Sequence, residues 1–411
     1  MQAFFVLGRE PRLSIAEIAS VYGSRIKKYS FLSEDILIAE MDSFDPHEAA
    51  LKLGGSVKYG FAEHFEGTDE ARLKGLIANR IIEQVKKNQT ARGQSPYGPG
   101  TVPVATATSD RVTFSISGYN HFSGKTFGFE IKSLLQKEGY GVRLATSKEP
   151  NMSAAAVVQA KLLTKGVDII ISRDGNSTWF GITADVQPYE DQSHRDYDRP
   201  ARDQVRGMMP VQLARTLLNL ALPNPAPESV FLDPFCGEGT VLMEAALLGV
   251  KNIIGADIDA HAIEDTRKNL EWLEREIPKL SPLTSNLYLR DARKTPQMPR
   301  IDAVVTEPYL GEPTLKPLTQ GEVSSRHKNL SGLYADAIRP IANALKKDGI
   351  LIFTLPAFKC GNKFLPFPKE GLLPVSMEAV ALPGPGQEKE NLIYKRADQF
   401  VGREILIARK K

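Results

Sequence analysis

The sequence predicts an α/β protein in which a smaller α+β region precedes a parallel sheet covered by helices. From residue 208 onward, short apolar runs typical of strands alternate with helical patterns, as they do in parallel sheets with helices on both faces. Ahead of residue 187 the strands and helices follow a less regular order. The chain has 411 residues, which is longer than most chains that fold around a single hydrophobic core. We therefore expect two or three domains.

Composition narrows the class of protein further. Hydrophobic residues make up 42% of the chain and charged residues 25%, and the net charge is only +3, which does not by itself indicate a nucleic-acid partner. No apolar run approaches the span of a bilayer and no export leader is evident, so we expect a cytoplasmic protein. The two cysteines, Cys236 and Cys360, are too few for a disulfide framework or a thiolate zinc site. No structural metal is expected.

The first 186 residues predict two small α+β units. In residues 1–60, SIAEIASVYG predicts a helix that begins at Ser14 as N-cap and ends at Gly23. The expected strands beside it are QAFFVLG and DILIAEMD. Residues 61–186 predict the helices ARLKGLIANRIIEQVKK, FEIKSLLQKEGY and NMSAAAVVQAKLLTKG, and the strands RVTFSISGY, VDIIISRDG and STWFGITADV. Residues 187–207 are polar and charged with no period of either kind, so we expect a linker there.

Residues 208–411 predict five parallel strands and an antiparallel hairpin at one edge of their sheet. The expected parallel strands are SVFLDPF, NIIGADID, NLYLRDA, DAVVTEP and GILIFTLP, with helical patterns between most of them. NLIYK and REILIARK follow with no room for a helix between them, so they are expected to pair antiparallel. This is the pattern of a Rossmann-like domain.

Four of the expected strand ends carry residues suited to binding a ligand. In open α/β sheets the ligand lies beyond the carboxyl ends of the strands. The first end is the glycine-rich stretch DPFCGEGT, and the second contains Asp257, which lies 20 residues after Gly237 and suits a ribose diol. The third end offers Asp291 as an acceptor for an adenine amino group. The expected cofactor-binding residues are Asp233, Phe235, Gly237, Gly239, Thr240, Asp257, Ile258, Asp291 and Ala292.

The glycine pattern distinguishes between two kinds of cofactor. A nicotinamide dehydrogenase also places an acid about 20 residues after a glycine turn, so this spacing alone is weak. Its G-x-G-x-x-G fingerprint, counted from Gly237, requires Gly or Ala at position 242, where this chain has Leu242. A helix set that far back leaves space for an amino-acid tail in place of a pyrophosphate. We therefore expect S-adenosyl-L-methionine, with a dehydrogenase as the weaker alternative.

Taken together, these strand ends resemble class I S-adenosylmethionine-dependent methyltransferases. More narrowly, the chain resembles the THUMP-domain tRNA guanine-N2 methyltransferases that modify guanosine 10 of tRNA. Supporting stretches are FFVLGREPRLSIAEI, LGGSVKYG and DYDRPARDQVRGMMPVQLARTLLNLA. The resemblance implies a ferredoxin-like unit at 1–60, a THUMP RNA-binding unit at 61–186, a linker at 187–207 and a methyltransferase domain at 208–411. It also implies tRNA as partner and backbone contacts with the cofactor around Gly207 to Pro210.

The fourth strand end departs from that family's pattern. The family motif reads Asp-Pro-Pro-Tyr, and the aligned residues here are Glu307, Pro308, Tyr309 and Leu310. Methylating a guanine amine requires an acceptor that draws its lone pair out of the ring and receives the departing proton, which suits a carboxylate. Pro308 would fix the chain so that the Glu307 side chain enters the cleft, and Tyr309 could stack on a flipped base. We expect Glu307, Pro308 and Tyr309 to be catalytic.

Other interpretations stay open at this stage. The enzyme could methylate another RNA or the N6 amine of adenine, or the chain could be a catalytically degenerate homologue that only binds RNA. We expect Asp259 to cap a helix and Cys236 to be a packed thiol. Candidate RNA-binding residues before the linker are Lys125, Lys132, Arg143 and Lys148.

Overall fold

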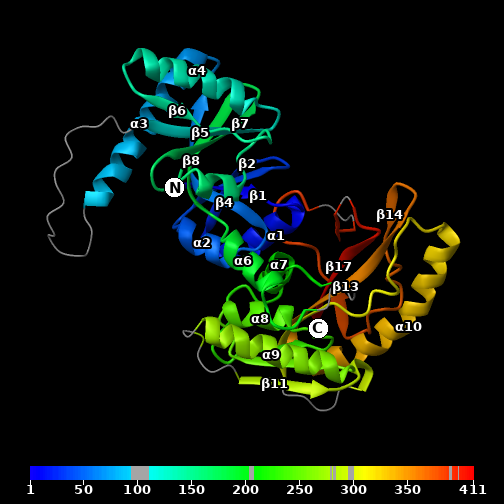
Figure 1. Cartoon of the computed structure of the whole chain (residues 1–411). Coiled ribbons are helices and arrows are strands. Elements are labelled where there is room, and N and C mark those ends of the chain that lie inside the picture. Colours follow the sequence, from blue (N-terminus) through cyan, green and yellow to red (C-terminus); the bar gives the residue numbers. More distant parts are fainter. Residues whose placement is uncertain are drawn as a thin grey trace. The chain divides into compact units, whose positions relative to one another are not determined.

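The chain forms two compact units in the computed structural model (Figure 1). The structure describes residues 1–93, 111–202, 208–277, 280, 284–294, 300–387, 391–396 and 398–411. The first unit comprises Met1–Pro11, Ser24–Leu51 and Ser56–Tyr189. The second comprises Arg12–Gly23, Lys52–Gly55 and Glu190–Lys411. Gly207, for which the resemblance implies a cofactor contact, lies outside the described residues.

The first unit is built on one eight-stranded sheet of described residues. Its strand order is β2-β3-β1-β4-β8-β7-β5-β6, antiparallel except where β5 pairs with β6 and β7. The strands are β1 (Gln2–Leu7), β2 (Ile26–Leu32), β3 (Ile36–Met41), β4 (Ser56–Glu66), β5 (Val112–Tyr119), β6 (Val142–Leu144), β7 (Val167–Asp174) and β8 (Ser177–Val186). The helices that accompany them are α2 (Pro46–Lys52), α3 (Glu70–Gly93), α4 (Gly124–Lys137) and α5 (Ala154–Gln159). The apolar stripe of α3 packs, as its period predicts, in one core with β5, β7 and β8.

The boundary expected at residue 60 falls inside a strand. β4 runs over eleven residues and pairs with β1 through its first half and with β8 along most of its length. Because one strand bonds to both neighbours, the sheet is continuous across that position. The structure therefore corrects the boundary between the two expected α+β units: their strands share one sheet.

The first helix also begins earlier than predicted. Helix α1 spans Pro11–Tyr22, followed by a 3-10 turn, Gly23–Arg25. Proline is favoured at the first helical position, where its missing N–H costs nothing. Ser14 is buried inside the helix, and its hydroxyl donates to the carbonyl of Gly55. The prediction that Ser14 is the N-cap is therefore wrong.

The second unit contains the predicted parallel sheet with antiparallel strands at one edge. Its order is β11-β10-β9-β12-β13-β17-β15, and the first five strands in that order are parallel. They are β9 (Val230–Asp233), β10 (Asn252–Asp257), β11 (Thr284–Leu289), β12 (Ile301–Thr306) and β13 (Leu345–Cys360). β17 (Val401–Lys410) pairs antiparallel with β13 and also with β15 (Met377–Ala379) and β16 (Ile393–Tyr394), and β14 (Lys363–Leu365) pairs with β13. The predicted fold class is confirmed.

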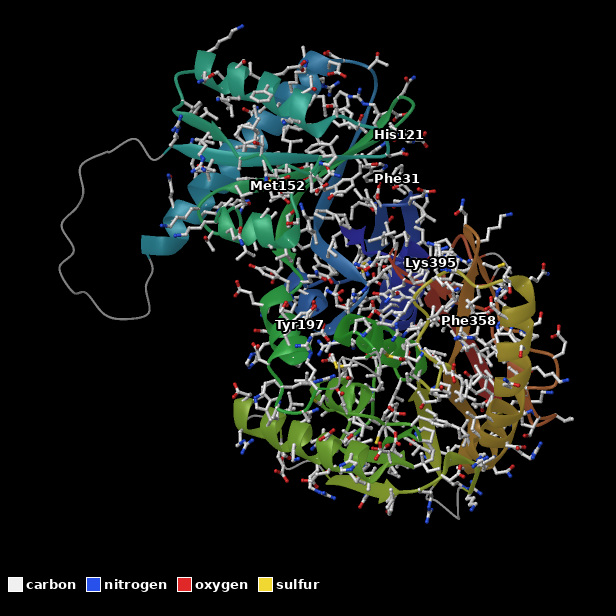
Figure 2. All side chains as sticks on the ribbon, turned by 45° about the vertical axis from the view of Figure 1, so that its right-hand side comes forward. Phe31, His121, Met152, Tyr197, Phe358 and Lys395 are labelled. Carbon is white, nitrogen blue, oxygen red and sulfur yellow. The ribbon has the colours of Figure 1, made fainter. Side chains whose placement is uncertain are left out.

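Helices cover both faces of this sheet. α7 (Val211–Ala221), α8 (Thr240–Leu247) and α9 (Ala260–Glu276) share one core, and α10 (Gln320–Ala344) packs in another. Adjacent residues Phe231 and Leu232 of β9 point into these two different cores, as the two-residue period of a strand requires. Phe358 lies in the core that contains α10 (Figure 2). No helix among the described residues is long and apolar enough to cross a membrane.

The segment expected to be an irregular linker contains a helix, α6 (Tyr189–Tyr197). Arg195 of α6 is buried and donates through Nε to Glu244 on α8 at 2.6 Å. Glu244 is fully buried and also accepts from Arg215 on α7 at 2.7 Å. Since buried ion pairs hold α6 in place of an apolar stripe, a search for hydrophobic periodicity could not find it.

Candidate active site

The predicted strand ends meet where the strand order reverses. β9 lies between β10 and β12, and the helices that follow these strands cover different faces. The carboxyl ends of such strands form a crevice where ligands of open α/β sheets bind. The loops after β9, β10 and β12 therefore surround one site in the second unit.

The loop after β9 needs glycine at two positions. Gly237 has φ +53° and Gly239 has φ +81°, both in the left-handed region that glycine adopts without strain. A Cβ on Gly239 would also meet the Thr266 side chain at 3.0 Å. Gly239 is the N-cap of α8, so the loop leads directly into a helix whose first N–H groups lack partners within the helix.

Asp257 at the end of β10 is joined to this glycine loop. The backbone N–H of Gly237 donates to Oδ2 of Asp257 at 3.0 Å, and the N–H of Asp259 donates to Oδ1 at 3.0 Å. Each carboxylate oxygen keeps a second acceptor position. The next residue, Ile258, is an exposed apolar side chain at 68%. Asp259 accepts from the N–H of His261 at 2.9 Å, which confirms its predicted role as a helix cap.

Asp233 at the end of β9 is buried, with 1% of its surface exposed. Its Oδ1 accepts from the Thr306 hydroxyl at 2.6 Å and from the N–H of Phe235 at 3.1 Å. Burial raises its pKa to about 7, and the nearby charges of Asp257 and Glu307 act in the same direction. The Asp233 side chain thus links β9 to β12 inside the protein, and its contact with the cofactor stays a prediction.

The third strand end carries an ion pair that the sequence did not reveal. Nη2 of Arg293 lies 2.7 Å from Oδ2 of Asp291, and its Nε contacts both carboxylate oxygens at 3.0 Å. These hydrogen bonds hold the pKa of Asp291 below its usual value. Ala292 is buried in the 3-10 turn Ala292–Lys294. Asp291 is thus an oriented acceptor just beyond the end of β11.

The fourth strand end contains the most important contact absent from the prediction. Arg403 at the start of β17 donates through Nε to Oε2 of Glu307 and through Nη2 to Oε1 at 2.9 Å. Burial alone would lower the pKa of Arg403, but the Glu307 carboxylate outweighs that effect and the pKa is raised. Arg403 also donates to the carbonyl of Met208 at 3.2 Å. The carboxylate predicted to be catalytic is held by a cation.

The residues after Glu307 differ in exposure. Pro308 is buried, whereas the Tyr309 side chain is 55% exposed at the tip of the sheet. The Tyr334 hydroxyl on α10 donates to the carbonyl of Tyr309 at 2.8 Å, which fixes the backbone of the turn. Burial raises the pKa of Tyr334 and the Glu307 charge adds to this, so its hydroxyl stays a donor. Tyr309 is accordingly free to offer its ring as a stacking surface.

A second arginine missed by the prediction holds the glycine loop. The Arg199 side chain is fully buried and donates through Nη1 to the Thr240 hydroxyl at 2.6 Å. Its Nη2 donates to Glu238 of the loop at 2.7 Å. Thr240, one of the expected cofactor-binding residues, therefore has its hydroxyl bonded to Arg199. Arg199 lies ahead of the first strand, outside the strand ends searched for ligand-binding residues.

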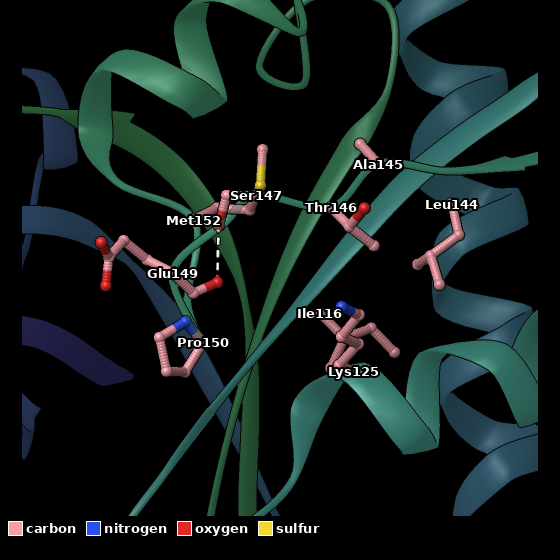
Figure 3. A pocket seen from close by; sticks show the side chains of 9 residues that line it. All are labelled: Ile116, Lys125, Leu144, Ala145, Thr146, Ser147, Glu149, Pro150 and Met152. Carbon is pink, nitrogen blue, oxygen red and sulfur yellow. Dashed lines mark hydrogen bonds between the residues drawn. The ribbon is translucent and has the colours of Figure 1, made fainter.

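The four candidate RNA-binding residues lie in the first unit, away from these strand ends in sequence. Lys125, Arg143 and Lys148 are exposed, and Lys132 is half-buried on α4. Lys125 lines a small pocket near Ser147 (Figure 3). Its volume of about 10 Å³ has room for a single water molecule at most. This pocket adds no support for a ligand site there.

The second unit has the fold and site of a class I methyltransferase: a parallel sheet in this order, a glycine turn after its first strand and a carboxylate after its second. The site fits S-adenosylmethionine, the cofactor of this class. Asp257 keeps acceptor positions for a ribose, and Ile258 presents an apolar surface for an adenine ring. Left-handed glycines allow close approach to the backbone.

Comparisons with known proteins agree with this class. Residues 199–365 match the family described as RMKL-like, methyltransferase domain. The chain is 31% identical over 144 residues to a probable tRNA (guanine(10)-N2)-dimethyltransferase of Methanothermococcus thermolithotrophicus, covering 34% of this chain and 78% of that protein. By this match the chain belongs to the tRNA (guanine(10)-N2)-dimethyltransferase family.

Two further comparisons set the extent of the likeness. The tRNA (guanine(10)-N2)-dimethyltransferase of Methanothermobacter thermautotrophicus is 33% identical over 153 residues, 37% of this chain and 40% of that protein. The matched region thus spans about two fifths of that relative's length. TrmN from Thermus thermophilus is 16% identical with a TM-score of 0.54, covering 100% of this chain and 99% of that one. At this identity the likeness supports the fold alone.

Proposed function

We propose that the protein transfers a methyl group from S-adenosylmethionine to the exocyclic N2 amine of a guanine in tRNA, at guanosine 10. The observation that carries this proposal is the match to relatives named for that reaction, together with a carboxylate and an exposed tyrosine beside the cofactor loop.

Cofactor binding is assigned to the loops after β9, β10 and β11. Asp257 accepts the ribose hydroxyls, Ile258 packs against the adenine, and Asp291 accepts from its amino group. The glycine loop from Phe235 to Gly239 lies against the amino-acid tail. Asp233 and Thr240 support the loop through their side-chain bonds to Thr306 and Arg199.

Target binding is assigned to the turn after β12. Bound S-adenosylmethionine supplies an electrophilic methyl group, so the protein must orient the amine and accept its proton. The amine lone pair is delocalised into the guanine ring, and an acceptor for the N2 hydrogens localises it toward the methyl group. Glu307 is that acceptor in our proposal. Tyr309 stacks on the base once it is flipped out of the tRNA.

The first unit is assigned to tRNA binding. Its exposed cations Lys125, Arg143 and Lys148 suit contacts with phosphates. We also propose that residues 61–186 form a THUMP RNA-binding unit and that the protein is cytoplasmic.

The experiment that tests the function uses the full chain, S-adenosylmethionine carrying a labelled methyl group, and an unmodified tRNA transcript. We expect N2-methylguanosine or N2,N2-dimethylguanosine by nucleoside mass spectrometry. Label in N6-methyladenosine would support the adenine alternative and overturn the proposal. Cofactor binding without any methylated nucleoside would support a degenerate RNA-binding protein.

A further inference from the structure

The fourth strand end departs from the Asp-Pro-Pro-Tyr pattern, and the structure shows what accompanies the change. Glu307 is one methylene longer than aspartate, and both of its oxygens bond to Arg403. The Glu307 side chain is 15% exposed and that of Arg403 is 8% exposed. The ion pair is therefore largely shielded from water, which screens it less than a pair on the surface.

Arg403 reaches the site because of the direction of its strand. β17 runs antiparallel to β13, so the start of β17 lies at the carboxyl edge of the parallel strands. Arg403 lies opposite Pro356 of β13 and Tyr394 of β16, which fixes its backbone on both sides. Its guanidinium therefore approaches Glu307 from a rigid part of the sheet.

The two parallel hydrogen bonds from Arg403, called the fork below, leave Glu307 able to accept further hydrogen bonds. Each carboxylate oxygen offers about two acceptor positions, and Arg403 occupies one on each oxygen. One position on each oxygen remains for an amine.

We propose that Arg403 is the positioning residue of this active site: it holds the Glu307 carboxylate in one orientation so that the remaining acceptor positions receive the target amine. This inference rests on the proposed function, because it assigns the acceptor role to Glu307. The bond from Arg403 to the carbonyl of Met208 extends the same network to the segment just before α7. Arg403 thus ties the target side of the cleft to that segment.

A double-mutant cycle tests the proposal. The variants are Arg403→Met, Glu307→Gln and the double variant, with labelled S-adenosylmethionine, tRNA transcript and total label in RNA as readout. We expect Arg403→Met to lower kcat about 10- to 100-fold, the range for one charge-assisted hydrogen bond, with KM for tRNA changed less than about 3-fold. The double variant should lie within about 3-fold of Glu307→Gln alone, because Arg403 acts through Glu307.

Two further variants separate positioning from a general effect of charge or folding. Arg403→Lys keeps the charge without the fork and should recover part of the lost kcat. Arg409→Met removes an exposed arginine from the same strand and should leave kcat within about 2-fold of wild type. Melting temperatures and cofactor affinities of all the variants show whether any loss is one of folding or of cofactor binding.

The outcomes separate this inference from the proposed function. Additive losses in the cycle, or a raised KM for tRNA with unchanged kcat, would overturn the positioning role and indicate a separate contact with RNA. If the wild-type product is neither N2-methylguanosine nor N2,N2-dimethylguanosine, the proposed function fails while the cycle still reports the coupling of Arg403 to Glu307. A wild-type chain that methylates no RNA overturns both.

Discussion

Replacing Asp233 by asparagine should make the second unit less sensitive to pH. The folded pKa of this carboxyl is about 7, against an ordinary value of 3.8. Between these values the folded state holds a proton that the unfolded state has lost, so the free energy of unfolding decreases as pH rises. Each pH unit in that window costs about 1.4 kcal/mol, so the whole shift amounts to about 4 kcal/mol.

Asparagine keeps the acceptor oxygen that Thr306 and Phe235 use but carries no charge. From pH 5 to the folded pKa of about 7 is two pH units, so the stability of Asp233→Asn relative to wild type should rise by about 3 kcal/mol between pH 5 and pH 8. Other titrating groups are common to both proteins and cancel in this difference.

The assay is urea unfolding of both proteins at pH 5 and pH 8, followed by tryptophan fluorescence. The chain has two tryptophans. Trp272 is on α9 of the second unit and Trp179 is on β8 of the first, so a Trp179→Phe background isolates the signal of the second unit. A relative stability that is the same at both pH values would refute the account of Asp233 as a buried carboxyl with a raised pKa.

Three other predictions concern the glycine loop, the buried ion pairs and the cofactor site. Gly239→Ala should lower the melting temperature and the cofactor affinity more than Gly237→Ala does. A Cβ at position 237 meets no atom within 4 Å and adds only the left-handed strain of about 1 kcal/mol. Equal effects of the two substitutions would argue against a contact between a Cβ at position 239 and Thr266. Glu244→Gln removes the buried negative charge that pairs with Arg195 and Arg215, and it should lower the free energy of unfolding in urea by about 3 to 5 kcal/mol. A decrease below about 1 kcal/mol would show that these ion pairs are dispensable for stability. Asp257→Asn should weaken S-adenosylmethionine binding about 10- to 100-fold by calorimetry, and unchanged affinity would remove Asp257 from the cofactor site.

The sequence sufficed to predict the sheet of the second unit and the strand ends that surround its crevice. Strands β9 and β10 are short apolar runs that end in aspartate, and β12 is followed directly by glutamate, so both their positions and the chemistry at their ends are visible in the order of residues. Parallel strands bring their carboxyl ends to one edge, which converts these local signals into a site.

The contacts that stabilise this site could not be predicted from the sequence. Arg403 lies near the start of β17, which runs antiparallel to β13 and therefore begins at the edge where the parallel strands end. Because only the ends of the predicted strands were considered for the site, Arg403 was not predicted. Arg199 and α6 are held by buried ion pairs with α8 and the glycine loop, and such pairs leave no apolar period. Whether Asp233 points into the cleft or toward Thr306 depends on the register of β9 against β12, which sequence spacing does not determine.

The central claim is that the cleft around Glu307 methylates the exocyclic amine of guanosine 10 in tRNA. The most direct measurement compares two transcripts, one with guanosine and one with inosine at position 10, since inosine differs only in lacking that amine. With the wild-type chain and labelled S-adenosylmethionine, we predict label in the guanosine transcript and none in the inosine transcript. Equal label in both transcripts would contradict the account.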